Sequence, residues 1–212
     1  MTMIKTNENG RSMIEMLGVL AIIGVLSVGG IAGYSKAMNK FKTNKVADNV
    51  SMLVANIKTL YAQQNTYKDL ENKTAISMGV VPDELGTDAT SGTLTNAFSG
   101  PVYIAASDST ASGDDKAFTI VFTKLSREAC ISLVTNDWGS GYSSGLIAIE
   151  ATGADMNTHG DLDAVMIGNA GTANKIATPG GTTQPVPMAV TAAATACSCK
   201  QGNTCSIAWK YY

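Results

Sequence analysis

An apolar stretch, MLGVLAIIGVLSVGGIAGY, runs from Met16 to Tyr34. It holds 19 residues and no charged side chain. At a rise of about 1.5 Å per residue, a helix of this length spans about 28 Å, close to the roughly 30 Å hydrocarbon core of a bilayer. The stretch therefore predicts a membrane-spanning helix.

The helical pattern continues well beyond the apolar stretch. Apolar residues follow at positions 46, 50, 53, 57, 60 and 61, and this spacing of three and four lines one face of a helix. No proline lies between Ser12 and Tyr67. We predict one helix of roughly 80 Å over this range, apolar all round in its first half and amphipathic in its second.

One acidic residue, Glu15, stands at the start of the apolar stretch, between Ile14 and Met16. An unpaired carboxylate in hydrocarbon is costly, so an ionisable group at this position is a candidate functional residue. Its position alone also fits an interfacial acid that reaches the lipid headgroups.

The residues before Glu15 favour the functional interpretation. The chain begins MTMIKTNENGRSMIE, with a short polar leader, then Gly10, and then Glu15 five residues later. This pattern resembles the class III signal of type IV prepilins, in which a short leader is cut after a glycine and the fifth residue of the mature chain is a glutamate. The resemblance implies cleavage between Gly10 and Arg11. Arg11 stands where this family usually has an N-methylated Phe or Met. An ordinary secretory signal fits poorly, because its cleavage would discard the apolar stretch.

Charge is distributed unevenly along the 212 residues, whose formal net charge is −2. Residues 1–45 carry six Lys or Arg against two Glu, and the remainder carries nine against fifteen acidic residues. Because the basic part is a short helical segment and the body is acidic, nucleic-acid binding is not indicated. The lysines at 36, 40, 42 and 45 would place the C-terminal domain in the cytoplasm by the positive-inside rule. The cysteines and the resemblance indicate export instead.

The four cysteines, Cys130, Cys197, Cys199 and Cys205, form an even number in a domain expected outside the cytoplasm. They predict two disulfides, for which three pairings exist. Cys199 and Cys205 bracket KQGNT, which can turn back on itself, so we favour that pair and join Cys130 to Cys197. Zinc is the competing interpretation, but the spacing lacks a C-x2-C knuckle and His159 is the only histidine.

Hydrophobic periodicity and turn residues predict the remaining elements. We expect a surface loop with a short helix at 68–100, followed by a hairpin of strands Pro101–Ala106 and Ala117–Thr123 whose second strand is half-buried. A helix Arg127–Thr135, capped by Ser126, comes next, and strands Leu146–Ala151 and Ala164–Ile167 follow it. The chain then continues with a loop at 168–187, a helix Val190–Cys197 and a final strand Ser206–Tyr212.

This order of elements resembles the larger type IVb pilins. The resemblance implies an α+β fold in which a long N-terminal α-helix, apolar in its first half, packs on an antiparallel β-sheet domain with a C-terminal disulfide-bounded region. We divide the chain into a leader (1–10), a transmembrane and polymerisation half of the helix (11–35), an amphipathic half (36–67) and a globular head (68–212).

The sequence evidence for a calcium site or a catalytic site is weaker. Asp155–Asp163 is like the start of an EF-hand loop, but His159 is a poor calcium ligand and Met166 stands where a bidentate Glu is needed. We favour a hydrogen-bonded turn. With one histidine, no Ser/His/Asp or Cys/His set can be assembled, so no catalytic residue, metal or cofactor is predicted and the chain is not expected to be an enzyme. The spacing Gly29-x3-Gly33 favours close approach of helices.

The resemblance implies a structural subunit of a type IV pilus, most like the major pilins. Its expected partners are copies of itself in a helical homopolymer, a prepilin peptidase and the assembly machinery of the inner membrane. Before assembly it would cross the inner membrane once, and afterwards it would lie in an extracellular pilus. Two alternatives stay open: a minor pilin or type II secretion pseudopilin, and a single-span membrane-anchored binding or enzymatic domain.

Overall fold

A computed structural model of the chain describes residues 13–109, 113–139, 144–153, 156, 176–177, 184–199 and 205–212. The chain divides into two compact units, Met1–Asn39 and Lys40–Tyr212. One helix, α1 (Met13–Leu60), contributes residues to both. We describe the two units separately.

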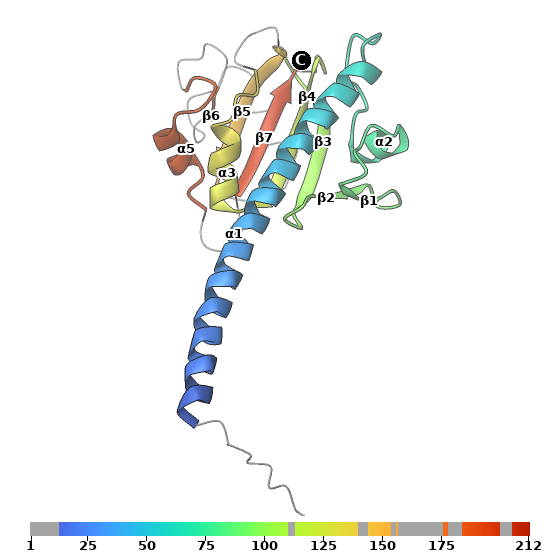
Figure 1. The fold of residues 1–212 in the computed structure, drawn as a ribbon. Helices are drawn as coiled ribbons and strands as arrows, with labels where there is room; N and C mark the ends of the chain where they lie inside the picture. Colours follow the sequence, from blue (N-terminus) through green and yellow to red (C-terminus); the bar gives the residue numbers. More distant parts are fainter. Residues whose placement is uncertain are drawn as a thin grey trace, which may run out of the picture. The chain divides into compact units, whose positions relative to one another are not determined.

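The described part of the first unit is helical throughout and consists of the N-terminal residues of α1 (Figure 1). The whole helix has 48 residues, or about 72 Å at the usual rise. Glu15 lies in its first turn, where the helix dipole favours a negative charge. The single long helix predicted from the sequence is confirmed.

The second unit is built on a seven-stranded sheet with the order β1-β2-β3-β4-β7-β5-β6, in which each neighbouring pair is antiparallel. The strands are β1 (Gly86–Asp88), β2 (Thr93–Thr95), β3 (Pro101–Ser107), β4 (Ala117–Leu125), β5 (Leu146–Thr152), β6 (Ile176–Ala177) and β7 (Cys205–Tyr211). In the described part of this unit, three helices accompany the strands: α2 (Asn72–Ser77), α3 (Arg127–Val134) and α5 (Val190–Ala196). The last strand in the sequence, β7, lies between β4 and β5 in the middle of the sheet (Figure 1).

Within this unit, the C-terminal residues of α1 pack on one face of the sheet. Four of their side chains are fully buried and belong to the same core as inward-facing residues of β4 and β7. They are Val46, Val50, Leu53 and Ile57. Burying a side chain of this size contributes roughly 1.5–3 kcal/mol, so this stripe holds the helix to the sheet.

Both faces of β4 are buried, although the sequence predicts a strand with one exposed face. Phe118, Ile120 and Phe122 face the main core, whereas Val121 packs with Ala208 on the opposite face. The strand is central, flanked by β3 and β7, and its outward face is covered as well. The expectation of a half-buried strand is therefore wrong.

The region 68–100 contains more structure than a loop with one short helix. The helix is present as α2, but β1 and β2 were not expected. Of their six residues only Leu94 is buried, so the alternation that marks a strand is missing from the sequence. Asp88 supports the turn that joins them, because its carboxylate accepts hydrogen bonds from the backbone N–H groups of Thr90 and Ser91.

The long helix ends at Leu60, earlier than the predicted Tyr67. Beyond Leu60 the chain turns, and the backbone N–H of Tyr67 donates to the carbonyl oxygen of Asp115 at 2.7 Å. The Tyr67 ring then lies 5.2 Å from the Tyr61 ring and 4.8 Å from that of Phe118, between centroids. Tyr67 packs against the sheet, and this packing is incompatible with the further two turns of helix that were predicted.

The other predicted elements are found close to their expected limits. The hairpin of β3 and β4, the helices α3 and α5 and the strands β5 and β7 are confirmed. Within the expected loop 168–187, the short strand β6 pairs with β5 through Ile149 and Ala177. The strand expected at Ala164–Ile167 lies outside the described residues.

Candidate functional site

The N-terminal part of α1 exposes a continuous apolar surface. Large apolar side chains from Met13 to Tyr34 are exposed; Leu26 and Ile31, for example, each show 69% of their surface. This helix is long and apolar enough to cross a membrane, judged by length and composition. Apolar surface of this extent requires either hydrocarbon or another apolar surface to cover it.

Glycines interrupt this apolar surface at five positions: Gly18, Gly24, Gly29, Gly30 and Gly33. No atom beyond the local helix lies within 4 Å of where a Cβ would stand at any of them. Flat, open positions of this kind let a second helix approach closely.

Glu15 is exposed at the start of this surface, beside the exposed Ile14 and Met16. Within the described residues it has neither an ion-pair nor a hydrogen-bond partner. Gly10 and Arg11 lie outside the described residues, as does most of Asp155–Asp163. Cleavage after Gly10, and the hydrogen-bonded turn that we favour over a calcium site at Asp155–Asp163, therefore stay sequence predictions.

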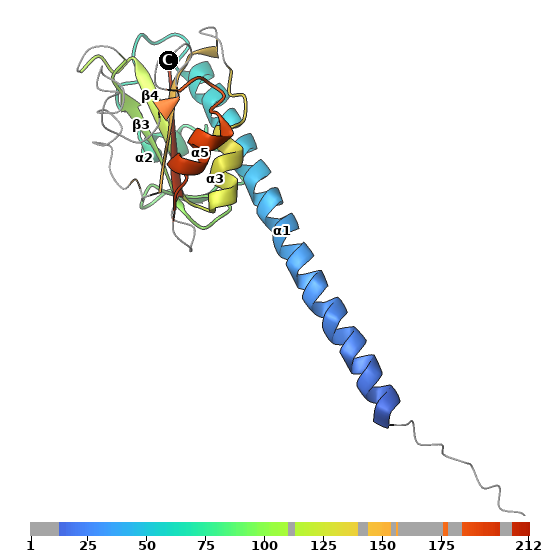
Figure 2. The same ribbon diagram turned by 90° about the vertical axis from the view of Figure 1, so that its left-hand side faces the viewer.

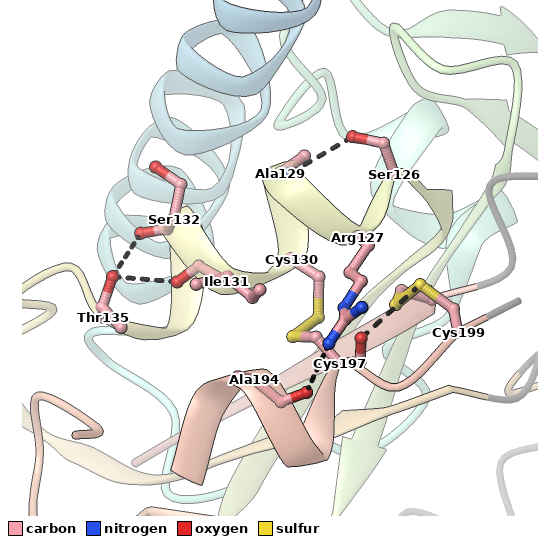
Figure 3. The surroundings of a disulfide bond; sticks show 11 residues. Ser126, Arg127, Ala129, Cys130, Ile131, Ser132, Thr135, Ala194, Cys197 and Cys199 are labelled. Atoms are coloured by element: carbon pink, nitrogen blue, oxygen red, sulfur yellow. Dashed lines mark hydrogen bonds between the residues drawn. A yellow bond between two sulfur atoms is a disulfide. The ribbon is translucent and has the colours of Figure 1, made fainter. Parts of the chain in front are cut away.

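The head carries a second candidate region, in which two disulfides join α3, α5 and β7 (Figure 3). Cys130 on α3 is bonded to Cys197 at the end of α5, with 5.8 Å between their Cα atoms. Cys199 is bonded to Cys205 at the start of β7, with 5.2 Å between Cα atoms. The structure thus contains the pairing that the sequence favours.

Hydrogen bonds fix the two helices that hold the first disulfide, and Figure 2 shows these helices side by side. Ser126 caps α3, as predicted, because its hydroxyl accepts a hydrogen bond from the Ala129 N–H at 3.2 Å. Arg127 Nη2 donates to the carbonyl oxygen of Ala194 on α5 at 3.3 Å (Figure 3). At the C-terminal end of α3, Trp138 Nε1 donates to the carbonyl oxygen of Leu133 at 2.6 Å.

Lysines attach α1 to the head, a role that sequence reasoning missed. Lys58 Nζ donates to the carbonyl oxygen of Ser144 at 2.9 Å, and burial lowers the pKa of this amine. Lys42 Nζ lies 5.6 Å from the centroid of the Phe98 ring. Their partners lie 56 or more residues away in the sequence, so no local pattern could have indicated these contacts.

Lys45 belongs to the same group, because its Nζ lies 3.6 Å from Glu84 Oε2. Both side chains are partly exposed, so the pair contributes little to stability by itself. Together these contacts show that the basic segment is not solely a membrane-flanking feature. Lys42 and Lys45 interact with the head itself.

The family described as PilS N terminal matches residues 40–210, most of the chain. The chain belongs to the PilS family of type IV pilins.

Curated relatives of this pilin extend the comparison. It is 28% identical over 169 residues to the major structural subunit of bundle-forming pilus from Escherichia coli O127:H6, with 79% of this chain and 80% of the relative covered. It is 27% identical over 158 residues to the toxin coregulated pilin of Vibrio cholerae, with 71% of this chain and 66% of that protein covered.

The fold of the pilin is also similar to a solved structure. The crystal structure of TcpA, a type IV pilin from Vibrio cholerae El Tor biotype, gives a TM-score of 0.55 at 17% identity. The alignment covers 81% of this chain and 99% of that chain. The predicted α+β architecture, with a long N-terminal helix on an antiparallel sheet, is confirmed.

Proposed function

We propose that this pilin is the major structural subunit of a type IV pilus and that it polymerises with copies of itself into a helical filament. The observation that carries the proposal is the exposed apolar surface of α1 from Met13 to Tyr34. Before assembly the bilayer covers this surface. In the filament the same surface of neighbouring subunits covers it, so that the apolar helices form the filament core.

Similarity to the Escherichia coli relative supports the major role, because the match covers about four fifths of each chain and the relative is a major structural subunit. Two further features fit a subunit exposed to an oxidising environment. Both disulfides lie in the head, and all four cysteines are bonded.

Maturation follows from the same proposal. Residues 1–10 act as a leader that a prepilin peptidase removes between Gly10 and Arg11. Residues 11–35 then hold the subunit in the inner membrane until the assembly machinery transfers it to the extracellular filament. Because α1 ends at Leu60, the amphipathic half of the helix comprises residues 36–60, and the following residues belong to the head.

The test compares cells with and without the gene for this chain. Filaments should be visible by electron microscopy only in its presence, and sheared, purified filaments should consist mainly of this chain. Filaments that persist without it, or that contain it in trace amounts, would identify a minor pilin or a pseudopilin. A detergent-extracted monomer in cells that form no filaments would identify a membrane-anchored binding or enzymatic domain.

A further inference from the structure

The two disulfides of the head stand next to each other. The sulfur atoms of Cys130, Cys197 and Cys205 all lie within 4.8 Å of one another. We call the Cys130–Cys197 bond the inner disulfide and the Cys199–Cys205 bond the outer disulfide. One sulfur of the outer bond, that of Cys205, therefore lies beside both sulfurs of the inner bond.

The two bonds differ in their accessibility. Cys130, Cys197 and Cys205 are fully buried, with 0% of their surface exposed. Cys199 is only partly buried; its Sγ lies 3.9 Å from the carbonyl oxygen of Cys197 (Figure 3). Of the four cysteines only Cys199 retains some exposure, so a thiol in solution meets this residue first, while the inner disulfide is shielded by the packed core.

This difference in accessibility determines which sulfur an external thiol releases. Thiol–disulfide exchange proceeds by attack of a thiolate on one sulfur and departure of the other. Attack at the accessible Cys199 expels Cys205 as a thiolate. The group expelled by an external thiol is thus the sulfur that lies within 4.8 Å of the inner disulfide.

We infer that the outer disulfide is an exchange site for the inner disulfide. Through it, an external dithiol reduces the inner disulfide, and an external disulfide oxidant forms it. The external partner belongs to the class of dithiol–disulfide reagents or oxidoreductases. A dithiol reduces the outer bond, is itself oxidised to a disulfide, and leaves Cys199 and Cys205 as thiols. The Cys205 thiolate then attacks the sulfur of Cys197, which forms a Cys205–Cys197 bond and releases Cys130, which takes up a proton.

The last step restores the outer bond. The Cys199 thiolate attacks Cys205, reforms the outer disulfide and releases Cys197, which also takes up a proton. In total, two electrons and two protons pass from the external dithiol to the inner disulfide. The same steps in reverse carry oxidising equivalents inward. Because an intramolecular thiolate replaces a bimolecular encounter inside a packed core, this route is faster than direct attack.

The first experiment measures how fast dithiothreitol reduces the inner disulfide in the full-length chain, held in detergent without denaturant. Alkylation at timed intervals and peptide mapping follow Cys130 and Cys197. The Cys199→Ser/Cys205→Ser double variant lacks the exchange site. We expect its inner disulfide to be reduced at least about tenfold more slowly than that of the wild type, because the intramolecular route is lost.

A loss of stability in the double variant cannot explain slower reduction of its inner disulfide. Removing the outer bond loosens the surrounding structure, which would expose the inner disulfide and accelerate its reduction. Equal or faster reduction in the double variant overturns the inference.

The second experiment uses two single variants that differ only in which thiol remains. Cys199→Ser leaves the Cys205 thiol beside the inner disulfide, whereas Cys205→Ser leaves the Cys199 thiol, which is not among the three clustered sulfurs. Without added oxidant, peptide mapping of the first should find Cys205 bonded to Cys130 or Cys197 in part of the molecules. The second should retain the Cys130–Cys197 bond alone. Retention of that bond in both variants, or equal rearrangement in both, contradicts the proposed role of Cys205.

Discussion

Lys58 Nζ lies 5.0 Å from the centroid of the Tyr211 ring. This contact joins the last turns of α1 to β7, an interior strand of the sheet, and the hydrogen bond from Lys58 to Ser144 adds the turn that precedes β5. One side chain thus connects three segments that are far apart in the sequence.

Replacement of this lysine should weaken the attachment of α1 to the head. We expect Lys58→Met to lower the free energy of unfolding by about 1–2 kcal/mol, because it removes the cation–π contact and the hydrogen bond to Ser144 while it keeps most of the apolar stem. Chemical denaturation of the full chain in detergent measures the change. Lys42→Met is the matched control: the Lys42 Nζ lies farther from its ring, at 5.6 Å, and it donates no hydrogen bond to any residue that the structure describes, so a smaller loss is expected. Equal losses would show that Lys58 has no special role.

Alkaline pH should destabilise the head. Burial raises the pKa of Tyr211, and burial also raises the pKa of Tyr61 and of Tyr67. Unfolded tyrosines ionise near pH 10, so from there upward the unfolded state loses protons that the folded state retains. The stability that these groups provide is complete below about pH 10 and is lost as pH rises toward their folded pKa values.

The Tyr211→Phe variant isolates the largest part of this effect. Its melting temperature should fall less steeply above pH 10 than that of the wild type, whereas Tyr212→Phe, at a half-exposed site, should behave like the wild type. Parallel pH profiles for all three chains would argue against a role for Tyr211 ionisation.

Loss of the inner disulfide should cost more than loss of the outer one. In the chain-entropy description, a loop of 67 residues is worth roughly 4 kcal/mol and a loop of 6 residues roughly 2 kcal/mol. We therefore expect Cys130→Ala/Cys197→Ala to lower the free energy of unfolding by about 2 kcal/mol more than Cys199→Ala/Cys205→Ala. Denaturant titration of both double variants provides the comparison. A larger loss from the outer pair would contradict this order.

Substitution at the proposed cleavage site should block maturation. A bulky residue in Gly10→Val would hinder the peptidase at the scissile bond, so the precursor should accumulate uncut in the membrane. Intact mass measurement distinguishes the two forms by the mass of residues 1–10. Gly18→Ala, at an open helical position, should be cleaved normally. A mature chain that begins at Arg11 in the Gly10→Val strain would refute the site.

Glu15 should act in assembly rather than in insertion. If the chain is cleaved after Gly10, as proposed, the amine of Arg11 becomes free and largely protonated at neutral pH, and Glu15 of a neighbouring subunit would offer the opposite charge in the same dry core. Arg11, four positions before Glu15 in the sequence, also carries a guanidinium, which is a second positive partner for this carboxylate. We expect Glu15→Ala to be inserted and cleaved normally but to enter filaments poorly.

Co-expression with the wild-type chain measures that defect. The fraction of mutant chain in sheared, purified pili should fall well below its fraction in the membrane. Asp48→Asn, which changes an exposed acid on the head part of α1, should be incorporated normally. Normal incorporation of Glu15→Ala would mean that Glu15 is only an interfacial acid.

Local patterns in the sequence were sufficient for most of the fold. The uncharged run after Glu15, the Ser126 cap and the alternation of Phe118, Ile120 and Phe122 each reflect forces that act within a few residues. Features set by distant partners were missed. No residue near Lys58 in the sequence predicts its contact with Tyr211. The hairpin of β1 and β2 is mostly exposed, so its sequence lacks the apolar alternation by which a strand is predicted.

The candidate site divides in the same way. The apolar surface follows from composition, whereas the spacing of the cysteines favoured one of three pairings without excluding the other two. The proximity of Cys205 to the inner disulfide depends on where β7 enters the sheet, which the sequence does not reveal.

The position of β7 sets an order of events during biogenesis. Export delivers the chain from the N-terminus, so β4 and β5 reach the far side of the membrane while the strand that must separate them is still in transit. Until Cys205–Tyr211 arrives, both strands present open edges and the aromatic core lacks Trp209. Translocation of the final strand is therefore the step that closes the sheet. A nascent subunit needs protection from edge-to-edge pairing with its neighbours until then.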